Sequence, residues 1–131
     1  MSLTIWHAAD TYIQVSGRNN RCCVYDLRCA SSPLHVLMHD HVIESYETMG
    51  IACAKWFYSA PLLVTGGDDC VVKVWDVSRA TEDALVTVLQ GHAAPVSAID
   101  VHPDESLVAS GGDEAKVCLF SAAGRVGGRL V

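Results

Sequence analysis

The chain has 131 residues, of which 50% are hydrophobic and 18% charged, and its formal net charge is -6. A chain of this length can bury one modest core. Basic residues occur singly, so the sequence excludes the electrostatic class of nucleic-acid binders, which need a basic patch. No apolar run reaches the length that a transmembrane helix requires.

In chain order, the sequence predicts short strands separated by turn residues. The first set covers residues 2–7, 12–15, 22–25 and 34–38. The second set covers residues 51–57, 62–65, 71–75 and 85–89, and the third covers 96–101, 107–110 and 116–120. A fourth strand of the third set would fall within residues 126–131, where Gly127 and Gly128 disfavour it.

The three sets are copies of one unit of roughly 45 residues. A shift of 45 positions carries Leu63–Asp76 onto Val108–Ser121 without a gap. A shift of 50 positions carries a weaker first copy onto the second, with Tyr25 on Trp75. Such a period is typical of repeat architectures, in which each unit buries its faces against its neighbours.

Four antiparallel strands with short connections form a small twisted sheet, and such sheets stack as the blades of a β-propeller. The sequence therefore predicts an all-β fold with one partial propeller of about three blades, at about residues 1–38, 39–89 and 90–131. Because a propeller closes with roughly four to eight blades, we expect an open or incomplete ring. The chain would be a piece of a longer propeller, a protomer that closes by oligomerising, or a module completing a partner's ring; the first is favoured.

Certain residues carry a family resemblance. They are Gly91-His92, Ser110, Asp113 and the dipeptide Trp75-Asp76. With these residues the chain resembles the WD-repeat family of β-propellers, strongly in the second and third copies and weakly in the first. The resemblance implies a non-catalytic scaffold for protein–protein interaction without a cofactor. The alternative is a structural subunit or fragment whose faces are buried in a larger propeller or assembly.

The resemblance also implies a hydrogen-bonded tetrad that fixes each blade. In the third copy its members are His92, Ser110 and Asp113, and Phe120 takes the fourth position without an N–H donor. In the second copy the members are Thr65, Asp68 and Trp75. Either His39 or His41 must supply the histidine by reaching back across an insertion, and we assign His41. The first copy has Val15, Arg18 and Tyr25 at these positions and can form no such network.

Two chemical interpretations compete with the tetrad. His92, Ser110 and Asp113 could form a catalytic triad, but Ser110 ends a strand before two glycines instead of occupying an exposed nucleophile elbow. His39-Asp40-His41 could ligate a metal, but the sequence places no third ligand, although Glu44 and Glu47 are near. We therefore expect no catalytic residue and no metal site.

The segment of residues 39–49 is the main departure from the repeat, because the gapless match between the second and third copies begins only at Ile51. A longer loop at a blade edge is a natural contact site, and Tyr46 is an amphipathic anchor. The alternative is a solvated insertion without a partner. The candidate partner-binding residues are Arg18, Asn19, Asn20, His39, Tyr46 and Glu47.

The expected partners are other proteins or peptide segments, a second copy, or the rest of a longer propeller, and not nucleic acid or a membrane. Six cysteines without a CxxC pair indicate a reducing compartment, either the cytoplasm or the nucleus. The first ten residues have no charged flank and no long apolar run, so we expect no signal peptide.

Overall fold

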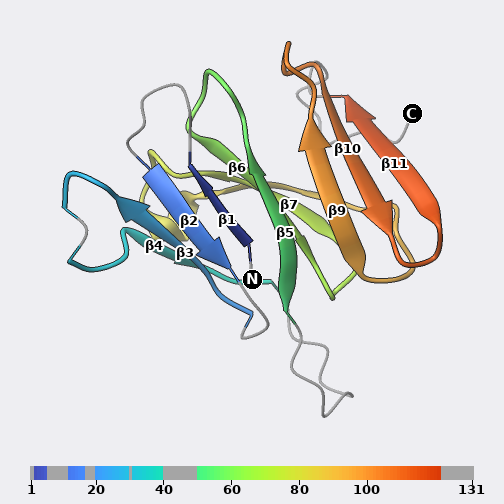
Figure 1. Ribbon diagram of the computed structural model, residues 1–131, viewed down its shortest axis with the longest axis horizontal. Helices are drawn as coiled ribbons and strands as arrows, with labels where there is room; N and C mark the ends of the chain where they lie inside the picture. Colours follow the sequence, from blue (N-terminus) through green and yellow to red (C-terminus); the bar gives the residue numbers. More distant parts are fainter. Residues whose placement is uncertain (1, 6–11, 17–19, 30, 40–49, 122–131) are drawn as a thin grey trace.

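The computed structural model describes residues 2–5, 12–16, 20–29, 31–39 and 50–121, which form eleven β-strands and no α-helix (Figure 1). The strands are β1 Ser2–Ile5, β2 Tyr12–Ser16, β3 Cys22–Asp26, β4 His35–Leu37, β5 Ile51–Trp56, β6 Leu62–Gly67, β7 Val72–Asp76, β8 Leu85–Leu89, β9 Val96–Val101, β10 Leu107–Gly112 and β11 Lys116–Ser121. A short 3-10 helix, η1 (Thr81–Asp83), precedes β8.

The strands form three antiparallel sheets, which we call blades 1, 2 and 3. Blade 1 has the order β1-β2-β3-β4, blade 2 the order β5-β6-β7-β8, and blade 3 the order β9-β10-β11. The predicted all-β fold with stacked propeller blades is confirmed, and the ring is not closed. The predicted fourth strand of the third copy lies outside the described residues.

The first strand of each blade lies at the centre of the stack, where β5 contacts both β1 and β9 (Figure 1). Because the strands alternate in direction, the connections gather at two rims. One rim carries the turns β2–β3, β6–β7 and β10–β11 and the connections β4–β5 and β8–β9. We call it the histidine rim, because His39 and His92 belong to it, and we call the other the opposite rim.

The second strands run further than the sequence predicts. β6 and β10 were expected to end at Thr65 and Ser110, but both continue for two more residues through a pair of glycines. The pairing of each with the first strand of its blade shifts register beside those glycines. Glycine allows a bulge there, and the continuation keeps the alternation of side chains running to the rim.

The core lies between the blades, in two clusters. Alternate residues of blade 2 point to opposite sides, so Leu63 and Trp75 pack in the cluster shared with blade 1. Val64 and Val74 pack in the cluster shared with blade 3. Leu63 and Val64 are both fully buried, so blade 2 is covered on both faces.

Three tight turns share one unusual backbone conformation. Asn20, Cys70 and Ala115 have positive φ angles of 57°, 68° and 61°. The shifts of 50 and 45 positions that relate the repeats carry these three residues onto one another. The position therefore demands a left-handed residue in every blade, and asparagine tolerates that conformation better than cysteine or alanine.

Candidate functional site

A buried chain of hydrogen bonds joins blade 2 to the connection that precedes it. The Trp75 indole N–H donates to Thr65 Oγ1 at 2.9 Å, and His39 Nε2 lies 2.6 Å from the same oxygen. His39 Nδ1 lies 2.8 Å from Asp69 Oδ1, and both side chains are 5% exposed or less. Since a carboxylate only accepts, Nδ1 carries the proton and Nε2 accepts from the Thr65 hydroxyl. Each polar group is thereby satisfied in the blade 1–blade 2 interface.

Blade 3 has the same network without its indole. His92 Nε2 lies 2.7 Å from Ser110 Oγ, and His92 Nδ1 lies 2.6 Å from Glu114 Oε1. Phe120 occupies the place of Trp75 and is buried, but it has no N–H to donate to Ser110. The blade 3 network therefore has one hydrogen bond fewer.

The alternation of a β-strand explains which residues meet. Thr65, Gly67 and Asp69 are two positions apart, so they share one side of the sheet. A Cβ at Gly67 would lie 2.5 Å from His39 Nδ1 and 2.7 Å from Asp69 Oδ1, too close for any side chain. Because Gly67 has no side chain, the His39 imidazole can lie across the strand between the Thr65 hydroxyl and the Asp69 carboxylate. Gly112 does the same between Ser110 and Glu114.

This alternation corrects three of the predicted tetrad members. The carboxylates are Asp69 and Glu114, so the assignment of Asp68 and Asp113 was wrong by one residue. Asp113 is exposed. The histidine of blade 2 is His39 in place of His41, which lies outside the described residues.

Asp68 has a different task from the one predicted. Its Oδ2 accepts the Gly50 N–H at 2.8 Å, and its own N–H donates to the Gly50 carbonyl at 2.9 Å. Asn20 holds the other end of the same connection. Its Nδ2 donates to the His39 carbonyl at 2.7 Å, and its Oδ1 accepts the His39 N–H at 3.1 Å. Both ends of the insertion are thus fixed on the histidine rim.

The buried positions of Asn20 and His39 correct their assignment as partner-binding residues. Asn20 is 1% exposed and His39 is 3% exposed, and their polar atoms bond within the protein. The other candidates, Arg18, Asn19, Tyr46 and Glu47, lie outside the described residues. Asn20 could have been recognised from the sequence, because asparagine is enriched at left-handed turn positions.

The geometry resembles a Ser-His-carboxylate array but lacks the access that catalysis needs. Ser110 is 2% exposed and faces the blade 2–blade 3 interface, so its hydroxyl cannot reach a substrate. Both ring nitrogens of His39 are engaged in hydrogen bonds, which leaves no lone pair for a metal ion. Burial raises the pKa of Cys22 to about 12 and of Cys53 to about 11, so these thiols are poor nucleophiles at neutral pH.

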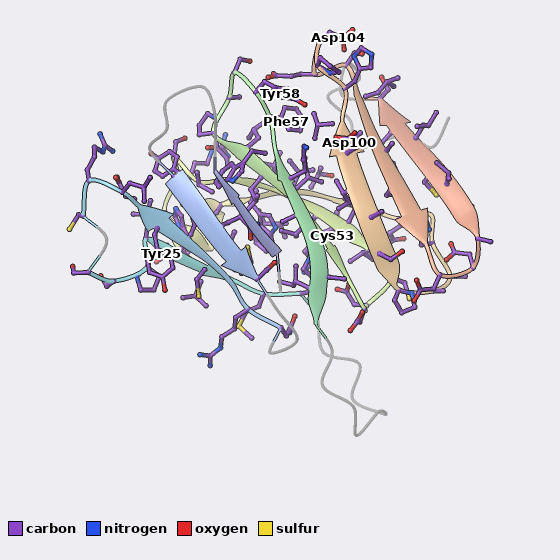
Figure 2. All side chains as sticks on the ribbon, viewed as in Figure 1. Tyr25, Cys53, Phe57, Tyr58, Asp100 and Asp104 are labelled. Carbon is purple, nitrogen blue, oxygen red and sulfur yellow. The ribbon has the colours of Figure 1, made fainter. Side chains whose placement is uncertain are left out.

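Two further contacts join neighbouring blades at the opposite rim, and no sequence pattern predicts either. Glu105, before β10, accepts from Ser59 N–H and from Ser59 Oγ at 2.8 Å. His35 on β4 bonds Thr81 Oγ1 at 2.7 Å and the Val77 carbonyl at 2.8 Å. Tyr58 and Asp104 mark this rim in Figure 2. Each interface between blades is therefore tied at both rims.

Antiparallel sheets that stack through their first strands, with a histidine–hydroxyl network in the interface, define the blades of a β-propeller. The sequence model of the WD domain, G-beta repeat, matches residues 31–76 and 83–121, which is more than half of the chain. The chain therefore belongs to the WD40 repeat family.

Relatives of known sequence match only part of their own length. The small ribosomal subunit protein RACK1y of Oryza sativa subsp. japonica is 37% identical over 83 residues, covering 62% of this chain and 24% of the relative. Rik1-associated factor 1 of Schizosaccharomyces pombe is 39% identical over 70 residues, covering 47% and 11%. The chain thus spans a quarter or less of these relatives.

Solved structures show the same fold. The Dos1 propeller matches with a TM-score of 0.76 and 26% identity, over 91% of this chain and 29% of that one. A chain of the mitotic checkpoint complex matches with a TM-score of 0.74 and 21% identity, over 95% and 34%. No helix among the described residues is long and apolar enough to cross a membrane.

Proposed function

We propose that the chain is a non-catalytic scaffold that binds protein segments at the loops of its histidine rim. The observation that carries this proposal is the anchoring of the insertion between β4 and β5. Asn20 and Asp68 hold its two ends, at His39 and Gly50, with four hydrogen bonds. A loop with fixed ends loses less conformational entropy when it binds, so its side chains are favourable anchors.

The chemistry of the insertion favours Tyr46 as the anchor. Tyrosine supplies a large contact area with a polar end, and it is enriched among binding hot spots. Glu47 and the overall charge of -6 favour partner segments that are neutral or basic. Arg18 and Asn19, which directly precede Asn20 in the sequence, are included in the same proposal. The family relatives named for ribosomal and pre-mRNA-processing factors support an intracellular role in assemblies, in the cytoplasm or the nucleus.

The test is a selection of displayed peptides on the full chain, followed by binding measurements with variants of the histidine rim. We expect Tyr46→Ala and Glu47→Lys to weaken the selected peptides at least tenfold while the urea unfolding midpoint stays unchanged. Tyr58→Ala, on the opposite rim, is the matched control and should not affect binding. Equal affinity for Tyr46→Ala and the parent would reject this surface.

A second candidate function is a structural one, in which the chain supplies blades to a larger propeller or assembly. It is favoured by the outer side of blade 3, where Val117 is 71% exposed although its equivalent in blade 2, Val72, is fully buried. Such uncovered apolar sheets promote association. We expect sedimentation of the isolated chain to change with concentration. A single 14.0 kDa species at every concentration, with a cooperative melt, would contradict this candidate.

A further inference from the structure

The outer strand of blade 2, β8, has a free edge that no strand of the described residues covers. It comes last in the order β5-β6-β7-β8, so it is paired only on the side of β7. With five residues it is longer than β4, the outer strand of blade 1, which has three. The unpaired N–H and C=O groups along such an edge are a template for another strand.

The edge of β8 is apolar and accessible. Proteins commonly protect an edge with proline or with charged residues, and residues 85–89 contain neither. Three apolar side chains of this strand are exposed, Leu85 by 42%, Val86 by 50% and Val88 by 39%. A bulge in the ladder with β7 leaves Val86 without a partner residue there, and Val86 is the most exposed of the three. A partner strand would remove this apolar surface from water.

The sequence of β8 is the same in both directions, Leu-Val-Thr-Val-Leu. If two copies of this strand pair antiparallel about a two-fold axis at Thr87, every residue meets a residue of its own type. Val86 then lies opposite Val88 of the second copy, Leu85 opposite Leu89, and Thr87 opposite its own counterpart. Cross-strand pairs of β-branched residues and of threonines stabilise an antiparallel sheet. The strand is therefore complementary to itself, as a two-fold interface requires.

The charges at the two ends of β8 have opposite signs, and they favour the antiparallel direction. Glu82 and Asp83 are exposed in η1, just before the first residue of the strand. Lys116 Nζ lies 2.6 Å from the Gly91 carbonyl oxygen, two residues beyond the end of the strand. An antiparallel partner brings the carboxylates of each copy toward the ammonium group of the other, whereas a parallel partner would bring like charges together.

We infer that β8 is the pairing edge for a second copy of this chain, so that blade 2 of each copy joins strand to strand about a two-fold axis at Thr87. The occupant is a second copy because both the sequence of the strand and the charges at its ends complement themselves. This inference goes beyond both candidate functions, since it uses neither the histidine rim nor the open side of blade 3. It can therefore fail or succeed independently of them.

The first test is a cross-link in the full chain, with Cys29→Ser as the common background because Cys29 is an exposed thiol. Thr87→Cys places two thiols on directly opposite residues, with Cα atoms about 4.5–5.5 Å apart, which is within the reach of a disulfide. Leu85→Cys is the matched control, because its two copies would lie on opposite sides of the axis. We expect mild oxidation to link Thr87→Cys into a dimer, identified by mass spectrometry of the joined peptides, and to leave Leu85→Cys monomeric. Equal cross-linking of both variants, or none in Thr87→Cys, would overturn the inference.

The second test reverses the charges and measures self-association by sedimentation equilibrium, with far-UV circular dichroism to verify that each variant is folded. We expect Lys116→Glu to weaken self-association by about tenfold or more, and the addition of Glu82→Lys and Asp83→Lys to the same chain to restore it. Val117→Lys, on the open side of blade 3, is the control for the other surface and should leave the Thr87→Cys cross-link unchanged. If the reversed charges do not restore association, or if Val117→Lys abolishes the cross-link, β8 is not the pairing edge.

Discussion

Asn20 binds both backbone groups of His39 with one side-chain amide, at 2.7 Å and 3.1 Å. The contact crosses from the β2–β3 turn of blade 1 to the residue whose imidazole enters the network of blade 2. It fixes the backbone from which that imidazole extends. Asn20 makes this contact from a turn position with a left-handed φ of 57°.

Asn20→Ala should therefore destabilise the protein by roughly 1–3 kcal/mol for the buried groups of His39 that lose their partner. The left-handed backbone adds about 1 kcal/mol, because alanine disfavours it. Asn20→Gly separates the two effects, since glycine tolerates the backbone but also lacks the amide. Urea unfolding measures both variants, and parental stability of Asn20→Gly would show that the amide contributes nothing.

Trp75→Ala should be among the most damaging substitutions, at roughly 3–5 kcal/mol. Trp75 is 6% exposed and belongs to the core between blades 1 and 2, and its N–H donates to Thr65. Trp75→Phe should recover most of this loss and leave the Thr65 oxygen short of one donor, as in blade 3. Equilibrium unfolding followed by far-UV circular dichroism, a signal that does not depend on Trp75, compares the stabilities of the two variants and the parent. A Trp75→Ala protein as stable as the parent would contradict the packing described.

Glu114→Ala should cost roughly 1–3 kcal/mol, because the buried Nδ1–H of His92 loses its acceptor. Asp113→Ala is the matched control, one residue away and exposed, and it should change stability by less than about 0.5 kcal/mol. Thermal and urea unfolding of the two variants measure the difference. A larger loss of stability in Asp113→Ala than in Glu114→Ala would show that Asp113, and not Glu114, belongs to the hydrogen-bond network.

The loss of stability at low pH should also depend on the Glu114 carboxylate. Burial raises the pKa of Glu114, but hydrogen bonds from its own amide, His92 and the Ala93 amide together lower that pKa below its ordinary value of 4.5. Because the folded-state pKa is depressed, this contribution is fully present above pH 4.5 and is lost as the pH falls through the lower folded value.

We therefore expect the urea midpoint to fall as the pH is lowered below 4.5, and to fall less steeply in Glu114→Gln than in the parent. Hydrogen bonds from Ser106 lower the pKa of Asp104 to about 2. Asp104 therefore also contributes to the loss of stability at low pH, but it does so equally in both proteins and cancels in the comparison. Parallel curves for the parent and Glu114→Gln would show that Glu114 has no part in it.

Ala115→Gly should stabilise the chain by up to about 1 kcal/mol, because Ala115 holds a φ of 61° that strains any residue with a Cβ. Ala98→Gly, within the strand β9, should instead destabilise by roughly 0.5–1 kcal/mol. Differential unfolding of the two variants tests the turn conformation. Destabilisation of similar size in both would mean that the turn carries no strain.

The sequence predicts the blades well because hydrophobic alternation and turn residues repeat at a constant spacing. It also brings Thr65, Trp75, His92 and Ser110 into the right networks. It fails at the carboxylates, because Gly-Gly-Asp-Asp and Gly-Gly-Asp-Glu look like turns from their first glycine. The glycines in fact continue the strand, and counting alternate positions from Thr65 would have reached Asp69.

His39 could not be distinguished from His41 by spacing alone. An insertion of variable length separates both from β5, and only the bonds to Asn20 place His39 beside Thr65. The ties of the opposite rim were equally beyond prediction. Glu105 and His35 each contact a residue more than forty positions away, and no local pattern records such a contact.

The WD domain match begins at residue 31 and again at residue 83, so each segment opens on the last strand of one blade and closes on the third strand of the next. The repeat that the sequence model matches is therefore offset by one strand from the blade of the fold. The segment of residues 83–121 carries the outer strand β8 of blade 2, then His92 and the three described strands of blade 3. Removing residues 83–121 would therefore take away the described strands of blade 3 and also β8, the strand that completes blade 2.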